Sequence, residues 1–380
     1  MWRLGLVLLV AAAFLAGATR ETRAGSSPHE GAKPWLWQCE QILGEEARYR
    51  CYVRLLLLDV DRSRDPAREL PRIDRRARIA GTSLAGSCHV LMHEVGRRYA
   101  AEHRLTLATL QHAVPRSNDP TCSAGFGMGL IMQLGPEIIR DGGAAAARTC
   151  ERLPTRYRAY TCVHGLGHAL LRGYHGRLRQ AVAACRRLAP SEAPDCAPGA
   201  FHDYWISLRG ADGTTRPLRP DTSPRSVCNG HLWFVRPCWY RYFVEQTDVA
   251  IDSPSDVLRA CRGLRPLQRS GCVGSAALQL GGDPVAQASL CAHLPRRDVA
   301  SCLRGAQVQV LAREPRRQLK LIRGCASLRR DERADCYAWY GRTLAVVTDR
   351  RFDCSRLSGL GRLACRAGAR QTDEALVTFS

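Results

Sequence analysis

The sequence is nearly without lysine. Only Lys33 and Lys320 occur in 380 residues, so the formal net charge of +21 comes almost wholly from arginine. The arginines are spread along the chain, and no nucleic-acid recognition motif accompanies them, so the sequence gives no support for a nucleic-acid partner. The arginine excess is interpreted first as a consequence of the nucleotide composition of the genome, and the alternative is attraction to an anionic envelope surface or another polyanion.

Several catalytic and cofactor motifs are also absent from the sequence. No C-x-x-C occurs, which argues against zinc ribbons and thioredoxin-type sites, and no C-x-x-C-H indicates covalent haem. There is no P-loop and no Rossmann fingerprint, so no nucleotide cofactor is predicted. H-E-x-x-H and G-x-S-x-G are missing too, which leaves metalloproteases and serine hydrolases without their usual motifs. Whether the chain is an enzyme stays open at this point.

Long apolar runs are confined to the start of the chain. Residues 1–18 join Arg3 to an apolar segment that ends in Ala16-Gly17-Ala18, the pattern of a cleaved signal peptide. An uncleaved membrane anchor is the alternative. No later run is long enough to span a bilayer, so we expect a mature chain without a membrane span, secreted or periplasmic.

Eighteen cysteines in such a chain predict disulfides. Their spacing predicts the partners, because sixteen of them fall into consecutive pairs separated by 10 to 12 positions. These pairs are Cys39/Cys51, Cys150/Cys162, Cys185/Cys196, Cys228/Cys238, Cys261/Cys272, Cys291/Cys302, Cys325/Cys336 and Cys354/Cys365. Cys88 and Cys122 stand outside this rule, and each resembles a second cysteine without a hairpin partner. We predict that these two bond to each other and link successive hairpins.

The paired segments align as a repeat. First cysteines from Cys150 onward recur every 29 to 43 residues, the size of one helical hairpin. Ser253-Pro254 and Asp283-Pro284 have the pattern of an N-cap with proline at N1, and each opens a short helix that ends at a first cysteine. We expect the second cysteine to start the second helix. The predicted fold is an all-α solenoid of about eight or nine disulfide-clamped hairpins.

Glycine recurs three residues after the second cysteine, which predicts close approach of neighbouring helices. The glycines at this position are Gly165, Gly199, Gly274 and Gly305.

The chain divides by composition into five stretches. After the signal peptide, residues 34–205 form N-terminal repeats, and residues 206–227 are a polar, Pro/Gly/Thr-rich insertion predicted to be a surface loop. Residues 228–369 form more regular C-terminal repeats, and residues 370–380 are a tail.

Histidines are concentrated in the N-terminal repeats. In the segment TCVHGLGHALL, His164 and His168 follow Cys162 by two and six residues, so on a helix they share one face. In CHVLMHEVG, His89 and His93 are likewise four residues apart. His202 lies six residues after Cys196, the same offset as His168 from Cys162. Equivalent positions of stacked hairpins form a line, so we expect these five side chains to converge.

Converging imidazoles predict a transition-metal site for copper, zinc or iron. Met128 lies six residues after Cys122 and is a further candidate ligand, one that would favour copper. Glu94 and Asp203 are expected to orient the rings, or to act as a base on metal-bound water, in a redox or hydrolytic role. The predicted ligands are His89, His93, His164, His168, His202 and Met128.

Two alternatives remain from the sequence. One is a non-enzymatic scaffold that binds a protein partner on the solenoid surface, with histidines that only pack. The other is non-covalent haem bound through two histidines. The remaining histidines have no such context and are expected to be structural or exposed: His103, His112, His175, His231 and His293.

Overall fold

A computed structural model gives the fold between residues 35 and 371. It describes this range apart from residues 64, 81–82, 116–121, 209–222, 231, 247–250, 252, 280–283, 306–318 and 348–352. Within these residues every regular element is a helix, as the sequence predicts. None of the described helices is long and apolar enough to cross a membrane.

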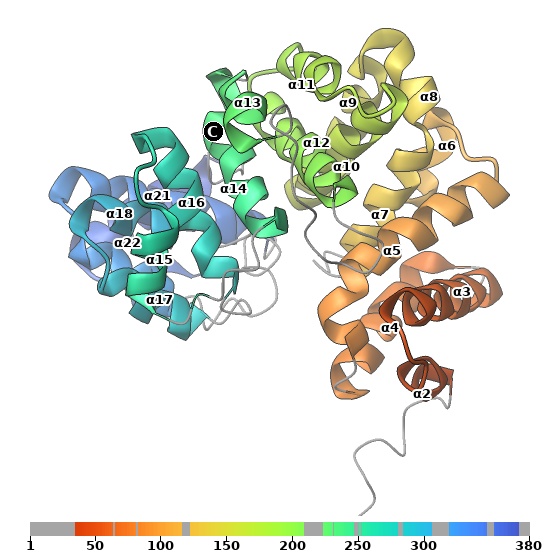
Figure 1. Cartoon of the computed structure of the whole chain (residues 1–380), viewed down its shortest axis with the longest axis horizontal. Helices are drawn as coiled ribbons and strands as arrows, with labels where there is room; N and C mark the ends of the chain where they lie inside the picture. The colour runs from red at the N-terminus through yellow and green to blue at the C-terminus, as the bar shows by residue number, and fades with distance from the viewer. Residues whose placement is uncertain are drawn as a thin grey trace, which may run out of the picture.

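The helices that carry the second cysteine of each pair stack side by side in one continuous row. Helices α5 and α7, which carry Cys88 and Cys122, belong to the same row. Figure 1 shows this row curving through the molecule. Its members are α3 (Glu45–Ser63), α5 (Ser83–Glu102), α7 (Cys122–Gln133), α10 (Arg156–Gly173), α12 (Ala193–Ser207), α14 (Val235–Gln246), α16 (Pro266–Gln279), α18 (Arg296–Leu303), α21 (Arg330–Val347) and α22 (Gly359–Arg370).

Shorter elements carry the first cysteines and pack on this row. They are α2 (Trp35–Glu40), α9 (Ala144–Glu151), α11 (Leu178–Arg186), α13 (Pro224–Asn229), α15 (Pro254–Ala260), which Cys261 caps, α17 (Pro284–Ala292), α20 (Leu319–Gly324) with η4 (Cys325–Ser327), and η5 (Cys354–Arg356). The remaining elements are α4 (Pro66–Ala80), α6 (Leu107–Ala113), α8 (Gly135–Ile138), η1 (Ile139–Asp141) and η3 (Leu232–Phe234). The helical-repeat architecture predicted from the cysteine spacing is therefore confirmed.

Nine disulfides clamp the repeats, and they are the nine predicted from spacing. Eight of them tie a short first element to the second helix of the same hairpin. These eight join Cys39 to Cys51, Cys150 to Cys162, Cys185 to Cys196, Cys228 to Cys238, Cys261 to Cys272, Cys291 to Cys302, Cys325 to Cys336 and Cys354 to Cys365. The bridge between Cys88 and Cys122 joins α5 to α7 instead. Nine bridges within one chain, with no free cysteine, are the chemistry of an oxidising, extracytoplasmic compartment.

The expectation that the second cysteine starts the second helix is wrong for all eight of these hairpins. The helix begins three residues before the cysteine in α12 and α14, and six residues before it in the other six. The second cysteines that lie inside their helices in this way are Cys51 in α3, Cys162 in α10, Cys196 in α12, Cys238 in α14, Cys272 in α16, Cys302 in α18, Cys336 in α21 and Cys365 in α22.

Residues that favour a helix start precede these cysteines and account for the earlier boundary. Thr155 accepts a hydrogen bond from the Arg158 backbone N–H and caps α10 ahead of Cys162. Pro266 occupies the first position of α16 ahead of Cys272, where a missing N–H has no cost. The first turn of each second helix therefore lies within the loop that the disulfide closes.

The two helix starts predicted from Ser-Pro and Asp-Pro pairs have different outcomes. The cap at Ser253 is confirmed, with a capping box to Asp256. Asp283 lies outside the described residues, and α17 begins at Pro284.

Glycines let the row pack backbone against backbone, as predicted. A Cβ atom built on Gly199 of α12 would lie 2.0 Å from the His164 carbonyl oxygen of α10. A Cβ atom on Gly167 of α10 would lie 2.0 Å from the Cys196 carbonyl oxygen of α12. Each helix therefore places a glycine against the other's backbone, and any larger residue would force the two apart.

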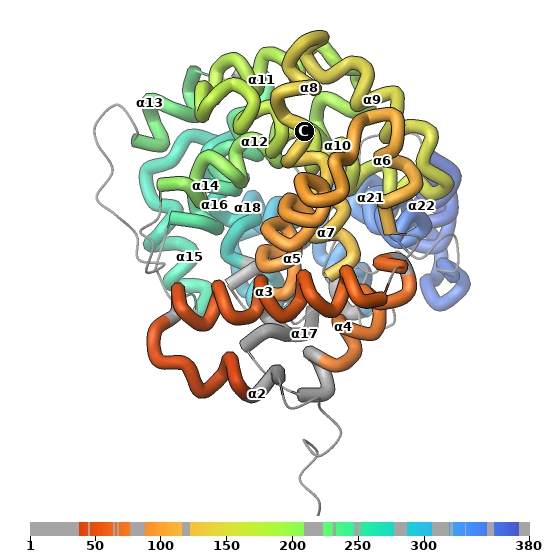
Figure 2. Tube along the Cα trace, turned by 90° about the vertical axis from the view of Figure 1, so that its right-hand side faces the viewer, coloured from red at the N-terminus to blue at the C-terminus, as the bar shows by residue number. Residues whose placement is uncertain are grey.

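The row curls until its two halves meet. Helix α21 contacts α10, although more than 150 residues separate them in the chain. Tyr157 and Tyr160 of α10 belong to the same buried cluster as Tyr340 and Leu344 of α21. Figure 2, turned by 90° from the view of Figure 1, shows α21 next to α10, in the same half of the molecule as α22. A second buried cluster runs from α2 to α14.

Some predicted boundaries lie partly outside the described residues. The predicted signal peptide does so entirely, and the tail is described only at Arg370, the last residue of α22, and Gln371. Both ends of the insertion are helical, with Ile206 and Ser207 in α12 and residues 224–227 in α13. The segment 209–222 between them lies outside the described part of the chain.

Candidate metal centre

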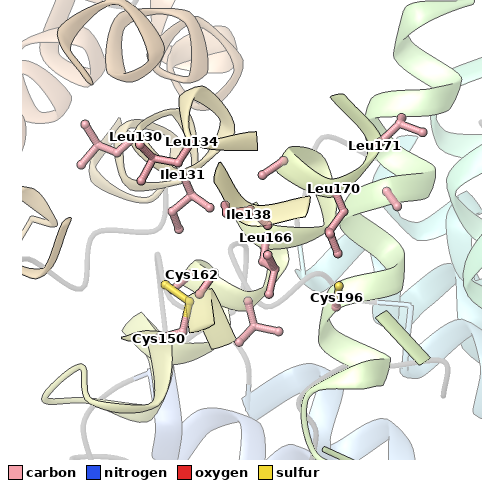
Figure 3. Close-up of a cluster of buried hydrophobic side chains, with 14 of the residues drawn as sticks. Leu130, Ile131, Leu134, Ile138, Cys150, Cys162, Leu166, Leu170, Leu171 and Cys196 are labelled. Atoms are coloured by element: carbon pink, nitrogen blue, oxygen red, sulfur yellow. A yellow bond between two sulfur atoms is a disulfide. The ribbon is translucent and has the colours of Figure 1, made fainter. Parts of the chain in front are cut away.

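Helix α10 carries two histidines on one face and a hydrophobic surface on the other. Leu166 and Leu170 are fully buried and pack in the cluster that α10 shares with α7, α8 and α12 (Figure 3). His164 and His168 lie about half a turn away around the helix, because side chains two positions apart point in opposite directions. The leucine packing thus fixes which face of α10 the histidines occupy.

His202 of α12 completes a group of three. One nitrogen from each of His164, His168 and His202 lies within 4.8 Å of the others. The ring of His168 has its centroid 5.3 Å from that of His164 and 5.0 Å from that of His202. All three side chains are buried. A buried triple-histidine group of this kind has the donor set that holds a metal ion.

Two further histidines reach the group from α5. The Nε2 atoms of His89 and His93 lie 3.3 Å apart. The ring of His93 has its centroid 5.1 Å from that of His168 and 6.2 Å from that of His202. His93 is buried, whereas His89 is partly exposed. The structure therefore brings all five histidines singled out in the sequence into one cluster, drawn from α5, α10 and α12.

Helix α7 packs between α5 and α10, and its glycines allow the backbone of α5 to approach closely. Gly125 and Gly129 meet the backbone of α5, where built Cβ atoms would lie 2.1 and 2.2 Å from the carbonyl oxygens of His89 and His93. On the other side, a Cβ atom on Gly165 of α10 would lie 3.0 Å from the Cα of Met128. Met128 is fully buried, and its role as a ligand stays a prediction.

Two carboxylates contact the rings. Asp203, one of the predicted partners, places Oδ1 3.6 Å from His168 Nδ1 and accepts two hydrogen bonds of 3.1 Å from Arg172. Glu245 of α14 places Oε1 3.3 Å from His202 Nε2. Carboxylates on the outer nitrogens of histidine ligands fix the ring orientation in metal sites.

The other predicted partner, Glu94, has different contacts. Its carboxylate accepts hydrogen bonds of 2.7 to 2.9 Å from Arg97 and Arg98, one turn along α5. Glu245 was missed in the sequence, although a signal exists. It lies seven residues after Cys238, the offset that Asp203 has from Cys196.

Burial favours the uncharged form of four rings in the cluster. It lowers the pKa of each buried ring, because a protonated imidazole loses its hydration there. The positive charge of Arg241 lowers the pKa of His164 and His202 further, whereas Asp203 opposes the decrease at His168. Neutral imidazole is the form that binds metal. The rings whose pKa is lowered are His93, His164, His168 and His202.

Each ring of the triple group also has a buried nitrogen that lacks a hydrogen-bond partner in the described part of the chain. These atoms are His164 Nδ1, both ring nitrogens of His168 and His202 Nδ1. Buried polar atoms usually have a hydrogen-bond partner, and a bound ligand is one way to give these nitrogens a partner. A transition-metal ion fits this donor set.

The remaining described histidines lie away from the cluster. All four are exposed, as predicted, and His103 faces Asp61 while His293 contacts the Ser289 carbonyl oxygen. They are His103, His112, His175 and His293; His231 lies outside the described residues.

Comparison with protein-family models, curated proteins and solved structures gives no match for this chain.

Proposed function

We propose that this chain is an exported metalloprotein in which His164, His168 and His202 hold one transition-metal ion. The observation that carries the proposal is the triple group itself: three buried imidazoles, each with one nitrogen within 4.8 Å of the others. The buried ring nitrogens that lack a hydrogen-bond partner support it, because a bound ion would supply a partner.

Binding would draw the three nitrogens together. Metal–nitrogen bonds of roughly 2.0–2.1 Å at a tetrahedral ion place ligand nitrogens about 3.3–3.4 Å apart. Nitrogens that lie up to 4.8 Å apart would therefore approach one another by about 1.5 Å at most. Rotation of the side chains can provide a movement of this size. The backbones of α10 and α12 need not move, since they are already in contact at Gly167 and Gly199.

Carboxylates face two of the three rings. Asp203 and Glu245 face the outer edges of His168 and His202, where a carboxylate raises the basicity of a ligating ring. Each carboxylate also contacts an arginine, Arg172 for Asp203 and Arg241 for Glu245. These ion pairs are close to neutral overall, so the positive charge of the ion would be only partly offset.

Three protein ligands leave one coordination position for water or a substrate. An ion held in this way supplies Lewis acidity or a bound hydroxide, and copper or iron adds redox chemistry. Copper, zinc and iron all suit imidazole, so the proposal covers these three. The cellular location that we propose is the periplasm or the extracellular space, supported by the nine disulfides and by the signal-peptide pattern of residues 1–18.

The test is elemental analysis of protein exported by its own cells and purified without nickel resin or chelator. We expect at least one transition-metal ion per chain in the wild type and loss of that ion in His202→Gln. His103→Gln is the matched control, because His103 is exposed and lies outside the cluster. Circular dichroism and a thiol assay check that helices and disulfides persist in each variant.

A folded wild type that holds no metal, even after incubation with copper, zinc and iron salts, would overturn the proposal. The histidines would then be packing groups, and the solenoid surface would become the place to look for a protein partner. A Soret absorption band in the exported protein would indicate bound haem instead.

A further inference from the structure

The pair His89 and His93 has a geometry of its own. Two nitrogens bound to one tetrahedral ion at roughly 2.0–2.1 Å lie about 3.3–3.4 Å apart. The Nε2 atoms of this pair lie 3.3 Å apart without any adjustment. Both rings come from one helix at positions four residues apart, the spacing that lets two imidazoles share an ion.

Packing fixes this pair in place. The backbone of α5 at both histidines lies against glycines of α7, Gly125 at His89 and Gly129 at His93. The bridge between Cys88 and Cys122 ties the same two helices together next to His89. The two histidines therefore occupy a braced stretch of helix, so little conformational entropy remains to be lost when an ion binds.

We infer that His89 and His93 hold a second metal ion, so that the cluster is a two-ion centre. This inference rests on the proposed function, because the first ion is the one at His164, His168 and His202. The His93 ring, with its centroid 5.1 Å from that of His168, is the link between the two groups. The ligand count agrees with this division, since five imidazoles exceed the four ligands of a tetrahedral ion.

The second ion has only two protein ligands among the five histidines, so exogenous ligands complete its coordination. His89 is partly exposed, which gives this end of the cluster contact with solvent. A small oxygen-donor ligand, neutral or anionic, would suit these open coordination positions. An anionic ligand that bridges the ions would also reduce the repulsion between them, as in other two-metal sites. The class of substrate that we infer is therefore a small oxygen-containing molecule or ion.

A hydrogen bond between two neutral imidazoles also accounts for a nitrogen–nitrogen distance of 3.3 Å, and it needs no ion. The number of ions bound distinguishes the two explanations. The experiment is equilibrium dialysis of metal-stripped, disulfide-intact protein against Zn²⁺ alone, followed by elemental analysis. Zinc suits imidazole and has no redox chemistry that would modify the protein.

We expect two zinc ions per chain in the wild type and in His103→Gln. His89→Gln removes a partly exposed ligand of the second ion alone, and we expect it to retain one. His202→Gln removes a ligand of the first ion, and we expect it to retain one as well. Because His93 is buried, His93→Gln serves only as a second check, and it should also retain one ion.

Other results overturn the inference in distinguishable ways. One ion in the wild type that His89→Gln retains and His202→Gln loses leaves the triple group standing and reduces the pair to a hydrogen bond. One ion that both variants lose indicates a single ion shared by both groups. No ion in the folded wild type overturns the two-ion centre together with the proposed function.

Discussion

Replacing Gly199 with alanine tests whether backbone contact between α10 and α12 positions the histidines. The added Cβ would lie 2.0 Å from the His164 carbonyl oxygen, and Cβ atoms essentially never approach other atoms closer than 3.0 Å. The obstructing atom belongs to the backbone, so no side chain can rotate away. The two helices must therefore separate by about 1 Å along this contact.

The expected cost follows from two opposing effects. Overpacking of a well-packed contact costs up to about 3 kcal/mol, and a clash with backbone belongs at the upper end of that range. Alanine in place of glycine in a helix interior stabilises by about 1 kcal/mol. We therefore expect Gly199→Ala to lower the free energy of unfolding by about 2 kcal/mol. It should also weaken zinc binding, because His202 moves away from His164 and His168.

Gly127→Ala is the matched control. A Cβ atom on Gly127 of α7 would lie 3.7 Å from Pro115 Cδ, an ordinary contact, so only the gain in helix propensity of about 1 kcal/mol remains. The assay is urea unfolding of both variants with disulfides intact and metal removed, followed by zinc titration. If Gly199→Ala is as stable as Gly127→Ala and binds zinc like the wild type, the close helix contact described above is incorrect.

Three further predictions concern the carboxylates, the buried rings and the bridge between α5 and α7. Asp203→Asn should weaken zinc binding about tenfold or more, because it removes the charge that faces His168. Glu94→Gln should leave zinc binding unchanged. Equal losses of zinc affinity in the two variants would refute the different roles of these carboxylates. Metal-free protein should lose stability as the pH falls below about 6.5, because the lowered pKa values leave the folded rings unprotonated while the unfolded chain binds the protons. The slope is up to about 1.4 kcal/mol per pH unit for each ring, so urea unfolding of His202→Gln should show a shallower decline, and an unchanged slope would count against buried neutral rings. Replacing Cys88 and Cys122 with alanine should cost about 4 kcal/mol, because their bridge closes a separation of 34 residues, and a loss below about 1 kcal/mol in urea would contradict that value.

Most of the fold can be predicted from the cysteine spacing. Pairs such as Cys150 and Cys162 close short loops, so partner, turn and helix order are all encoded within a few dozen residues. The starts of the second helices were misplaced because a cap such as Thr155 is a weak signal beside a cysteine. The return of α21 to α10 was not predictable, because it depends on small rotations summed over several repeats.

The equal offsets of His168 and His202 placed these two rings together correctly, since stacked helices align equivalent positions. Carboxylates were harder to assign. Glu94 has arginines three and four positions later on the same helix, so its ion pairs form within α5. Glu245 reaches His202 from the next helix of the row, and the only sequence signal for it is its offset from Cys238, which equals that of Asp203 from Cys196.

The order of the disulfides bears on how the protein matures. Every bridge joins two cysteines that follow each other along the chain, including the one that links Cys88 to Cys122. A chain that emerges N-terminus first into an oxidising compartment exposes the first cysteine of each bridge immediately before its correct partner. An oxidant that joins consecutive thiols as they appear therefore gives the native connectivity, and disulfide isomerisation is not required. Vectorial oxidation of this kind would leave each hairpin clamped before the next one has arrived to stack on it.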